Sequence, residues 1–568
     1  MHVKRTVRRR GDKEYTYLSL VEAIRVNGKS TQRVLLRLGE VGELERTGQL
    51  DRIVAALRSY TEREWLAVDE LEGKGAPSFG ALAAVSSYFD RLGLRGHFAD
   101  IGAKRGSKHL EDTVLVMVAN RLCDPGSKRR TIYEWLDTVA LPEGVSTPLL
   151  DQCYRGLDAL AEVKEATEEL LYSRLTDLTN LDLRLALYDL TSTYFETQGN
   201  GGASFPSRAY GYSRDKRGGR PQVVIGLLVT GNGIPIAHYV FSGNTSDSST
   251  LPTVMADYQQ RFAIGKIALV ADRGLISEKN LAEVHEAGFD HVMATRLHND
   301  DDVRGVLEIA EASEKKNWVE VGDEVCALEV VRDEQRYVVV DSPERRARDD
   351  HRRQELLTRT ESKLVELADR VSAGRLSDPA KIGVAADRIL RDSGVGRCFT
   401  TTIREGSFTW NHDQRALHYD EQLLAGRFVL STSLDTTTAS TADVVRHYKM
   451  LCLVEHRFWV MKDFLGLRPV FHRLEARVRA HIAVCVMAAV IEAVMAEDLA
   501  RAHVMDPEIA DQVMTPRRAL VELSHIRKHR LEEAKHRIEL VDRPTALQRA
   551  ILDAMAVDTS SWTRAAIL

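Results

Sequence analysis

The chain has 568 residues, which is too long for one ordinary domain, so we expect three or four domains. Its 44% apolar and 28% charged residues are typical of globular proteins with an ample core. The formal net charge of −5 excludes a polycation, so any surface that binds nucleic acid must be local. The six cysteines form no CxxC pair, which favours free thiols in a reducing compartment. The apolar run 482–494 contains Glu492 and is too short for a membrane span.

The first 75 residues are predicted to form a hairpin and a helix that could contact DNA. Residues 1–10 are rich in Lys and Arg and suit either a disordered tail or a basic arm for phosphate. The alternating segments 15–24 and 31–38 flank Asn27-Gly28, which is a strong hairpin-turn signal. Helical periodicity then runs from residue 44 to about residue 71.

A wholly helical pattern covers residues 79–180. Basic residues cluster near the ends of these helices, among them Lys128, Arg129 and Arg130. The segment is therefore predicted to be an all-helical DNA-binding domain, although a solvated surface explains each basic residue equally well.

Strand patterns begin near residue 181 and predict a mixed-sheet α/β domain of the ribonuclease-H type. Three strands are followed by a helix, a strand, a helix and a strand, at 183–190, 222–229, 234–241, 249–262, 266–271, 277–287 and 289–295.

Two of these predicted strands end on a carboxylate. The run LRLALYD ends on Asp189, and KIALVAD ends on Asp272. An aspartate at a strand end must be hydrated, paired or bound to a metal, because burying a bare carboxylate is costly. We therefore interpret the two aspartates as halves of one site.

Residues 297–425 change in character and are predicted to be a β-rich insertion that interrupts the sheet domain. Its long charged helix, at 345–371, is interpreted as a solvated face. The five predicted segments are then 1–75, 79–180, 181–296 joined with 426–500, 297–425, and a helical C-terminal region at 501–568.

A helix is predicted over 440–466, with Ser440 and Asp443 as its N-terminal capping box. Glu455 and Lys462 lie seven residues apart on its apolar stripe and so share one face. A partly exposed Glu–Lys pair would explain them, but two aspartates without a partner favour Glu455 as a third metal ligand. Three carboxylates suit two Mg²⁺ ions, for which Mn²⁺ could substitute, and such a pair supports in-line phosphoryl transfer.

Five motifs, in this order, resemble those of the DDE transposases of bacterial insertion sequences. The resemblance spans roughly residues 110–490 and is closest to the branch with a β-rich insertion before the Glu helix, the IS-four superfamily type. The motifs are YDLTSTYFE (188–196), GYSRDKR (211–217), GLLVTGNGIPIAHYVFSGNTSDSSTL (226–251), VADRGLIS (270–277) and Tyr448…Glu455…Lys462. The family signature is Tyr-x2-Arg-x3-Glu-x6-Lys, and Leu451 stands here where the Arg would be.

This resemblance implies that Asp189, Asp272 and Glu455 bind two Mg²⁺ ions, while Tyr448 and Lys462 hold phosphates near the transposon end. It implies hydrolytic nicking at the ends of the element, followed by attack of the freed 3′-OH on target DNA. The expected partners are double-stranded DNA, as terminal inverted repeats and as target, and a second copy of the chain in a homodimer on paired ends.

Further candidates for DNA contact share a basic or aromatic side chain near these motifs. The glycine-rich, basic and aromatic loop 210–220 suits a phosphate backbone. In relatives, a Trp of the insertion stacks on a flipped base, although a core position would also explain either Trp here, and interdomain pairing would also explain the basic residues after Glu455. The candidates are Arg214, Lys216, Arg217, Arg220, Arg273, Trp318 with Trp410 second, Arg468 and Arg477.

Three other functions were weighed against transposition. A haloacid-dehalogenase-type phosphatase needs a carboxylate at the third position of its DxDxT motif, where this chain has Thr191, and is discounted. A nuclease or junction resolvase of the same fold, and a repurposed DNA-binding protein without activity, remain alternatives. The expected location is the bacterial cytoplasm at the nucleoid, without a membrane.

Overall fold

The computed structural model describes two compact units, each considered by itself here. The first contains Met1–Ala76, His529–Leu540 and Arg564–Leu568, and the second contains Pro77–Lys528 and Val541–Thr563. The described residues are 1–26, 29–58, 60, 72–178, 184–196, 198–202, 205–215, 217–262, 268–272, 275, 278–295, 301–322, 324–404, 407–533, 536–560, 562 and 566–567.

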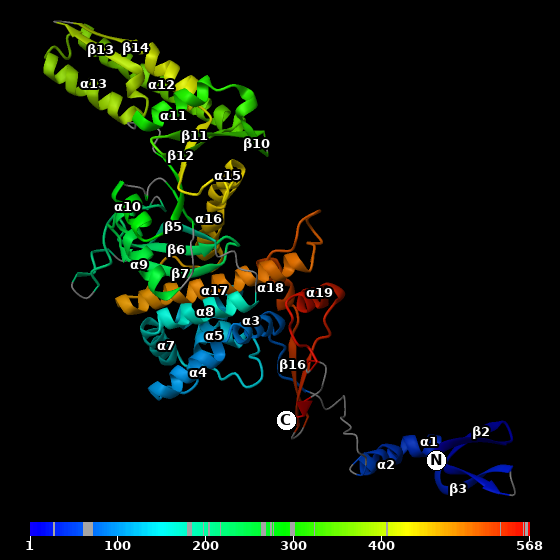
Figure 1. The fold of residues 1–568 in the computed structure, drawn as a ribbon. Helices are drawn as coiled ribbons and strands as arrows, with labels where there is room; N and C mark the ends of the chain where they lie inside the picture. Colours follow the sequence, from blue (N-terminus) through cyan, green and yellow to red (C-terminus); the bar gives the residue numbers. More distant parts are fainter. Residues whose placement is uncertain are drawn as a thin grey trace. The chain divides into compact units, whose positions relative to one another are not determined.

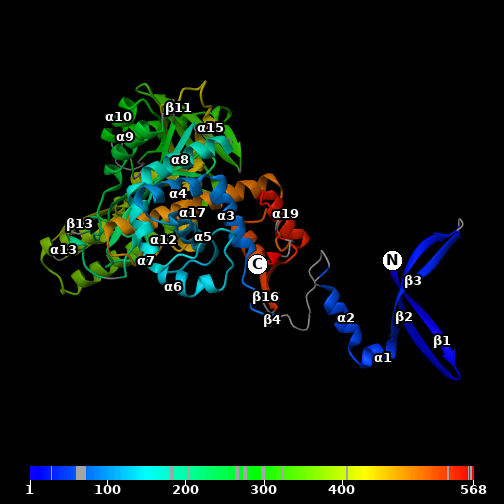
Figure 2. The same ribbon diagram turned by 90° about the horizontal axis from the view of Figure 1, so that it is seen from below.

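An antiparallel three-stranded sheet opens the first unit, in the order β1-β2-β3, with α1 and α2 after β3 (Figure 2). The predicted hairpin is confirmed, although its turn residues lie outside the described part of the chain. The first ten residues form a strand instead of a tail, because pairing with β2 satisfies their backbone groups. The elements are β1 (His2–Arg10), β2 (Lys13–Val26), β3 (Lys29–Glu40), α1 (Val41–Arg46) and α2 (Gln49–Arg58).

The C-terminal part of the chain adds strands to a second sheet, of order β18-β17-β16-β4. The prediction of a helical C-terminal region is wrong at β16 and β17. Their near-repeat, KHRLE at 528–532 and KHRIE at 535–539, alternates in the manner of strands. The members are β4 (Glu72–Gly73), β16 (Lys528–Glu533), β17 (His536–Val541) and β18 (Ala566–Ile567), and the C-terminal helices are α18 (Pro516–Ser524) and α19 (Ala546–Ala554).

Helices dominate the start of the second unit, as predicted. The long helix α17 (Glu475–Arg501) is buried along most of its length and packs against α5, α7 and β7 (Figure 1). In the part of the chain that the structure describes, no helix combines the length and apolar character needed to cross a bilayer. The helices are α3 (Gly80–Arg91), α4 (Leu94–Arg105), α5 (Leu110–Cys123), α6 (Lys128–Tyr133), α7 (Leu150–Glu162) and α8 (Lys164–Leu178).

A nine-stranded mixed sheet forms the centre of the second unit, in the order β10-β11-β12-β15-β9-β8-β5-β6-β7. Strands β6 and β7 continue β5 in antiparallel fashion, whereas β8 and β9 run parallel to it. The mixed α/β architecture predicted from the sequence is confirmed. The elements are β5 (Leu185–Tyr194), β6 (Gln222–Thr230), β7 (Pro235–Ser242), α9 (Leu251–Arg261), β8 (Ala268–Ala271), α10 (Glu278–Glu286) and β9 (Asp290–Ala294).

Part of the insertion continues this sheet. Strands β10, β11 and β12 extend it, and β15 (Arg427–Thr432) joins them to β9 by antiparallel pairing on both sides. The first elements are α11 (Asp301–Ala312), β10 (Val319–Gly322), β11 (Val325–Arg332) and β12 (Gln335–Asp341).

The rest of the insertion has a small core of its own. The predicted charged helix is present as α12 (Pro343–Ser372), which packs against α13 (Pro379–Ser393) and β14. The segment 399–410, whose pattern favours one strand, forms two strands, β13 (Phe399–Arg404) and β14 (Ser407–His412), which pair in antiparallel fashion. The insertion therefore contains the expected strands, but it holds more helix than the prediction of a β-rich segment implies.

The helix predicted over 440–466 is interrupted twice. Ser440 and Asp443 form the expected capping box at the start of α15 (Thr441–Lys449). At Met450 the helix breaks, and α16 (Leu451–Trp459) follows. A π-helical turn at Val460–Phe464 ends the segment, so Lys462 does not repeat the position of Glu455 on the helix face.

Candidate active site

Asp189 and Asp272 occupy neighbouring positions on two adjacent parallel strands. The register of β5 and β8 pairs Tyr188 with Ala271, and each aspartate is the next residue along its strand. β5 does not end at Asp189 as predicted but continues to Tyr194, because the residues after Asp189 keep pairing with β6. Asp189 instead marks the point where the parallel partner strand stops.

Both aspartates share one face of the sheet. Successive side chains of a strand point to opposite faces. Leu187 and Val270, two residues before each aspartate, belong to the core that includes α17, whereas Tyr188 and Ala271 belong to the core on the α9 side. The alternation therefore directs both carboxylates to the α17 face of the sheet.

The helix α16 covers that same face and carries Glu455. It contacts β5, and its Val454 and Phe458 are buried in the α17-side core, which leaves Glu455 exposed. A cavity of about 520 Å³ is lined by all three predicted carboxylates, Asp189, Asp272 and Glu455. The structure thus brings the predicted ligands together from two strands and one helix.

Burial, together with the negative charges of Asp272 and Glu455, raises the pKa of the Asp189 carboxyl to about 6, against the opposing effects of a backbone hydrogen bond and of Arg214. A cation bound beside Asp189 would reverse this effect, because its positive charge favours the ionised carboxylate. Their donors are all oxygens, which is the ligand set of Mg²⁺ or Mn²⁺. The residues present therefore fit a divalent-metal site.

Comparison with known families agrees with this geometry. Residues 185–491, more than half of the chain, match the family model described as transposase DDE domain. The chain belongs to the DDE transposases. Residues 3–70 also match the N-terminal domain of IS1634 family transposases, and no curated protein matches the sequence. The resemblance noted in the motifs is confirmed, and the chain is a DNA transposase, an enzyme of the polynucleotidyl transferase class that depends on divalent metal.

Two signature residues of the transposase have different surroundings. The hydroxyl of Tyr448 donates to Oδ1 of Asp272 at 3.4 Å, at the edge of the carboxylate cavity. Nζ of Lys462 lies 2.7 Å from Oδ1 of Asp215, which Arg468 also contacts, at 2.5 Å. Burial lowers the pKa of Lys462 even though the Asp215 carboxylate opposes the shift. Lys462 is therefore held by a buried acid.

Among the described residues of loop 210–220 of the transposase, two arginines form ion pairs and one is exposed. Arg214 forms an ion pair with Asp247, and its charge acts on the Asp189 carboxyl. Arg220 pairs with Glu196 at 3.1 Å, whereas the side chain of Arg217 is exposed. Lys216 lies outside the described residues, and so does Arg273.

Three other predicted DNA contacts are engaged within the protein. The ring of Trp318 is partly buried under the guanidinium of Arg427, 5.7 Å from its centroid, and Trp410 packs in the insertion core. Arg477 forms two hydrogen bonds of 2.8 Å to Asp158 on α7. These are the core and interdomain roles that the sequence left open for them.

Sequence reasoning missed two basic residues at the catalytic cavity. Arg345 and Arg348, in the first turns of α12, line it together with the carboxylates. The signal was Ser342-Pro343, an N-cap followed by proline at the first helical position, which starts the helix directly after β12. The beginning of the charged helix is therefore part of the site.

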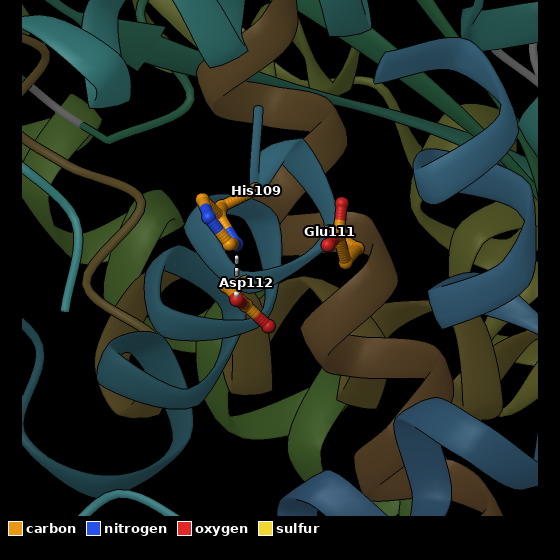
Figure 3. A group of neighbouring side chains, drawn as sticks. All are labelled: His109, Glu111 and Asp112. Carbon is orange, nitrogen blue, oxygen red and sulfur yellow. Dashed lines mark ion pairs between the residues drawn. The ribbon is translucent and has the colours of Figure 1, made fainter. Parts of the chain in front are cut away.

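A second group of possible metal ligands lies at the start of α5, away from the predicted triad (Figure 3). Nδ1 of His109 lies 3.4 Å from Oδ2 of Asp112, and Glu111 is the third member. Asp112 also accepts hydrogen bonds from Arg95, at 3.2 Å, and from the backbone of Ser146, at 3.0 Å. These contacts give Asp112 a structural role in fastening α5 to its neighbours.

Proposed function

We propose that Asp189, Asp272 and Glu455 are the catalytic carboxylates and hold two Mg²⁺ ions, for which Mn²⁺ can substitute. The observation that carries this proposal is the in-register placement of the two aspartates on the face that α16 covers. Bound there, the two cations would assist the attacking oxygen and stabilise the leaving oxygen of a phosphodiester.

The neighbouring side chains would hold the DNA. The Tyr448 hydroxyl, already at hydrogen-bond range of Asp272, would turn its proton to a phosphate oxygen. Leu451, where the family signature has Arg, lines the same cavity as Arg345 and Arg348. We propose that these two arginines supply the positive charge that the signature Arg provides in relatives.

The substrate would be the terminal inverted repeats of the element, cut at their ends and joined to target DNA by the freed 3′-OH. Two copies of the chain would act on paired ends, inside the bacterial cytoplasm at the nucleoid. The predicted DNA contacts stay part of this proposal, with Trp318 as the residue that stacks on a flipped base and Lys462, Arg214, Lys216, Arg217, Arg220, Arg273, Arg468 and Arg477 as the basic contacts.

A cleavage and joining assay on DNA that carries the element's own ends tests the proposal. Wild type, Glu455→Gln and, as a matched control, Glu308→Gln on the exposed face of α11 are compared in Mg²⁺. We expect Glu455→Gln to bind the ends but to lose cutting and joining, while Glu308→Gln behaves as wild type. Nicking without joining by the wild type would instead support the nuclease alternative. Full activity of Glu455→Gln would exclude Glu455 as a ligand.

A further inference from the structure

A second cavity, of about 310 Å³, lies where the helical region meets the chain that follows α16. Arg121 of α5 and Lys128 of α6 line one side. The segment 466–472 and His481 of α17 line the other. A single water needs only about 10–15 Å³ of such space, so a phosphate group fits.

The lining is strongly cationic. Among the described residues that line this cavity are three arginines, one lysine and two histidines, and none is acidic. The nearest acids are already engaged. Asp124 pairs with Arg130 at 2.8 Å, and Asp158 pairs with Arg477 at 2.8 Å. Of the lining cations, Arg468 is paired with Asp215 and Asp463, whereas Arg121, Lys128 and Arg129 have no ion pair to an acid among the described residues.

Lys128 is the central observation. Its residue is only 5% exposed, and among the described residues its ammonium forms no hydrogen bond or ion pair. Burial, and then the charge of Arg121, lower the pKa of Lys128 to about 8. An ammonium that no protein group pairs depends for its solvation on water in the cavity or on a bound anion.

Two other residues that line the cavity each have a buried nitrogen without a hydrogen-bond partner. Nδ1 of His481 is buried and has no hydrogen-bond partner, while its Nε2 lies 3.2 Å from the carbonyl of Leu467. The guanidinium of Arg121 bonds the carbonyls of Leu465 and Gly466, at 3.3 and 3.2 Å, but its Nε is unpartnered. The unpartnered Nε–H of Arg121 is a donor and favours an anionic ligand, whereas Nδ1 of His481 is an acceptor while Nε2 donates to Leu467 and would accept from a water or a sugar hydroxyl.

We propose that this cavity binds one phosphate of the DNA backbone, a site that rests on the proposed transposase function. Arg468 connects it to that function, because Arg468 lines the cavity and shares Asp215 with Lys462. The exposed residues at the edge of the cavity suit a DNA strand better than a free anion. Phe471 is 69% exposed there and offers a base or sugar an apolar surface, and Arg129 is open to a neighbouring phosphate.

Binding of the full-length protein to duplex DNA with the element's terminal repeat tests the proposal, without divalent metal and at several salt concentrations. We expect Lys128→Met to weaken binding about tenfold at 0.1 M salt, as for loss of one charged hydrogen bond. It should also reduce the slope of log K against log salt by about 1. Because Met removes an unpaired buried charge, the thermal midpoint of the DNA-free variant should rise, which separates the effect from misfolding.

The control is Lys104→Met, which removes an exposed lysine of the same helical region and should leave the slope and the midpoint unchanged. An unaltered slope in Lys128→Met overturns the proposal. A second outcome also overturns it. If inorganic phosphate stabilises the wild type but not Lys128→Met, while both bind DNA equally, the cavity takes only a free anion. A failure of the catalytic assignment shows instead in the cleavage and joining assay with Glu455→Gln, so the two failures are distinguishable.

Discussion

Arg457 of α16 and Glu492 of α17 form an ion pair in which both side chains are less than one-tenth exposed. Arg457 follows Glu455 by two residues, so the pair fastens the helix that carries the proposed third ligand to the central helix of the unit. It also explains why an acid interrupts the apolar run 482–494. Since a buried charge needs its partner, each residue accounts for the presence of the other.

Replacing Glu492 by Gln should lower the free energy of unfolding by about 3–5 kcal/mol, because Arg457 keeps a buried charge without its counter-ion. The measurement is the midpoint of urea or thermal unfolding of the second unit's transition. The double variant Arg457→Met with Glu492→Leu serves as the control and should recover most of the loss. A Glu492→Gln variant as stable as the wild type would contradict a buried charge pair.

Asp215 should contribute strongly to stability and to DNA binding, because its nearly buried carboxylate pairs with both Lys462 and Arg468. We expect Asp215→Asn to destabilise the protein by about 3 kcal/mol and to weaken binding of the element's ends. Asp463→Asn is a matched control, since Asp463 contacts the same Arg468 at 3.0 Å but is half-exposed. Asp463→Asn should lower the free energy of unfolding by less than about 1 kcal/mol. Equal effects of the two variants would show that burial is not the deciding factor.

The role of the arginines at the start of α12 can be tested by removing one of them and placing an arginine at position 451 instead. Arg348→Ala should slow cleavage of the element's ends about tenfold, the effect of losing one charged contact to phosphate. Adding Leu451→Arg, which places the signature residue of the family at the same cavity, should restore part of the lost rate. The readout is single-turnover cleavage. If Leu451→Arg rescues nothing, the two positions do not serve the same phosphate.

Glu168 of α8 predicts a pH dependence of stability. It is buried, accepts from the backbone N–H of His238 at 3.0 Å and pairs with Arg261 at 2.8 Å and Lys164 at 2.9 Å. Burial alone would raise the pKa of Glu168, but the side chain of His238, 2.7 Å away, and then Lys164 and Arg261 outweigh it and lower the pKa to about 2. A depressed carboxyl pKa stabilises the fold above the unfolded value of about 4.5 and loses this effect as pH falls toward 2.

The variant Glu168→Gln should therefore unfold with about 3 kcal/mol less free energy than wild type at pH 7, and the difference should be smaller at pH 3. Urea unfolding at both pH values measures it. Glu165→Gln, on the same helix but mostly exposed, should change stability by less than about 1 kcal/mol at either pH. A constant difference for Glu168→Gln from pH 7 to pH 3 would contradict the depressed pKa.

The sequence predicted the mixed sheet and the three carboxylates because both depend on local patterns. Asp189 and Asp272 each follow an apolar run, and Glu455 interrupts an apolar stripe. Which strands pair depends on contacts far apart in the chain, so the shared register of the two aspartates became visible only in the structure. The continuation of β5 past Asp189 was missed because its hydroxyl residues were interpreted as the exit from the strand.

Other features escaped prediction because they contradict average behaviour. A lysine at a helix start, such as Lys128, is normally exposed, and here it is buried. The first turns of a highly charged helix are normally solvated, yet Arg345 and Arg348 line the catalytic cavity. The strands β16 and β17 were missed for another reason, since their short alternation is masked by many charged residues.

The insertion between β9 and β15 also delays the synthesis of the third proposed ligand relative to the first two. The ribosome makes Asp189 and Asp272 first, and it must then synthesise the whole insertion before it reaches Glu455. At about 5–20 residues per second, this interval lasts roughly 10–40 s. During that time, the nascent chain has two of its three proposed ligands and no helix α16 to cover them. A transposase built in this order lacks its proposed third ligand through most of its own synthesis, and so does any chain truncated within the insertion.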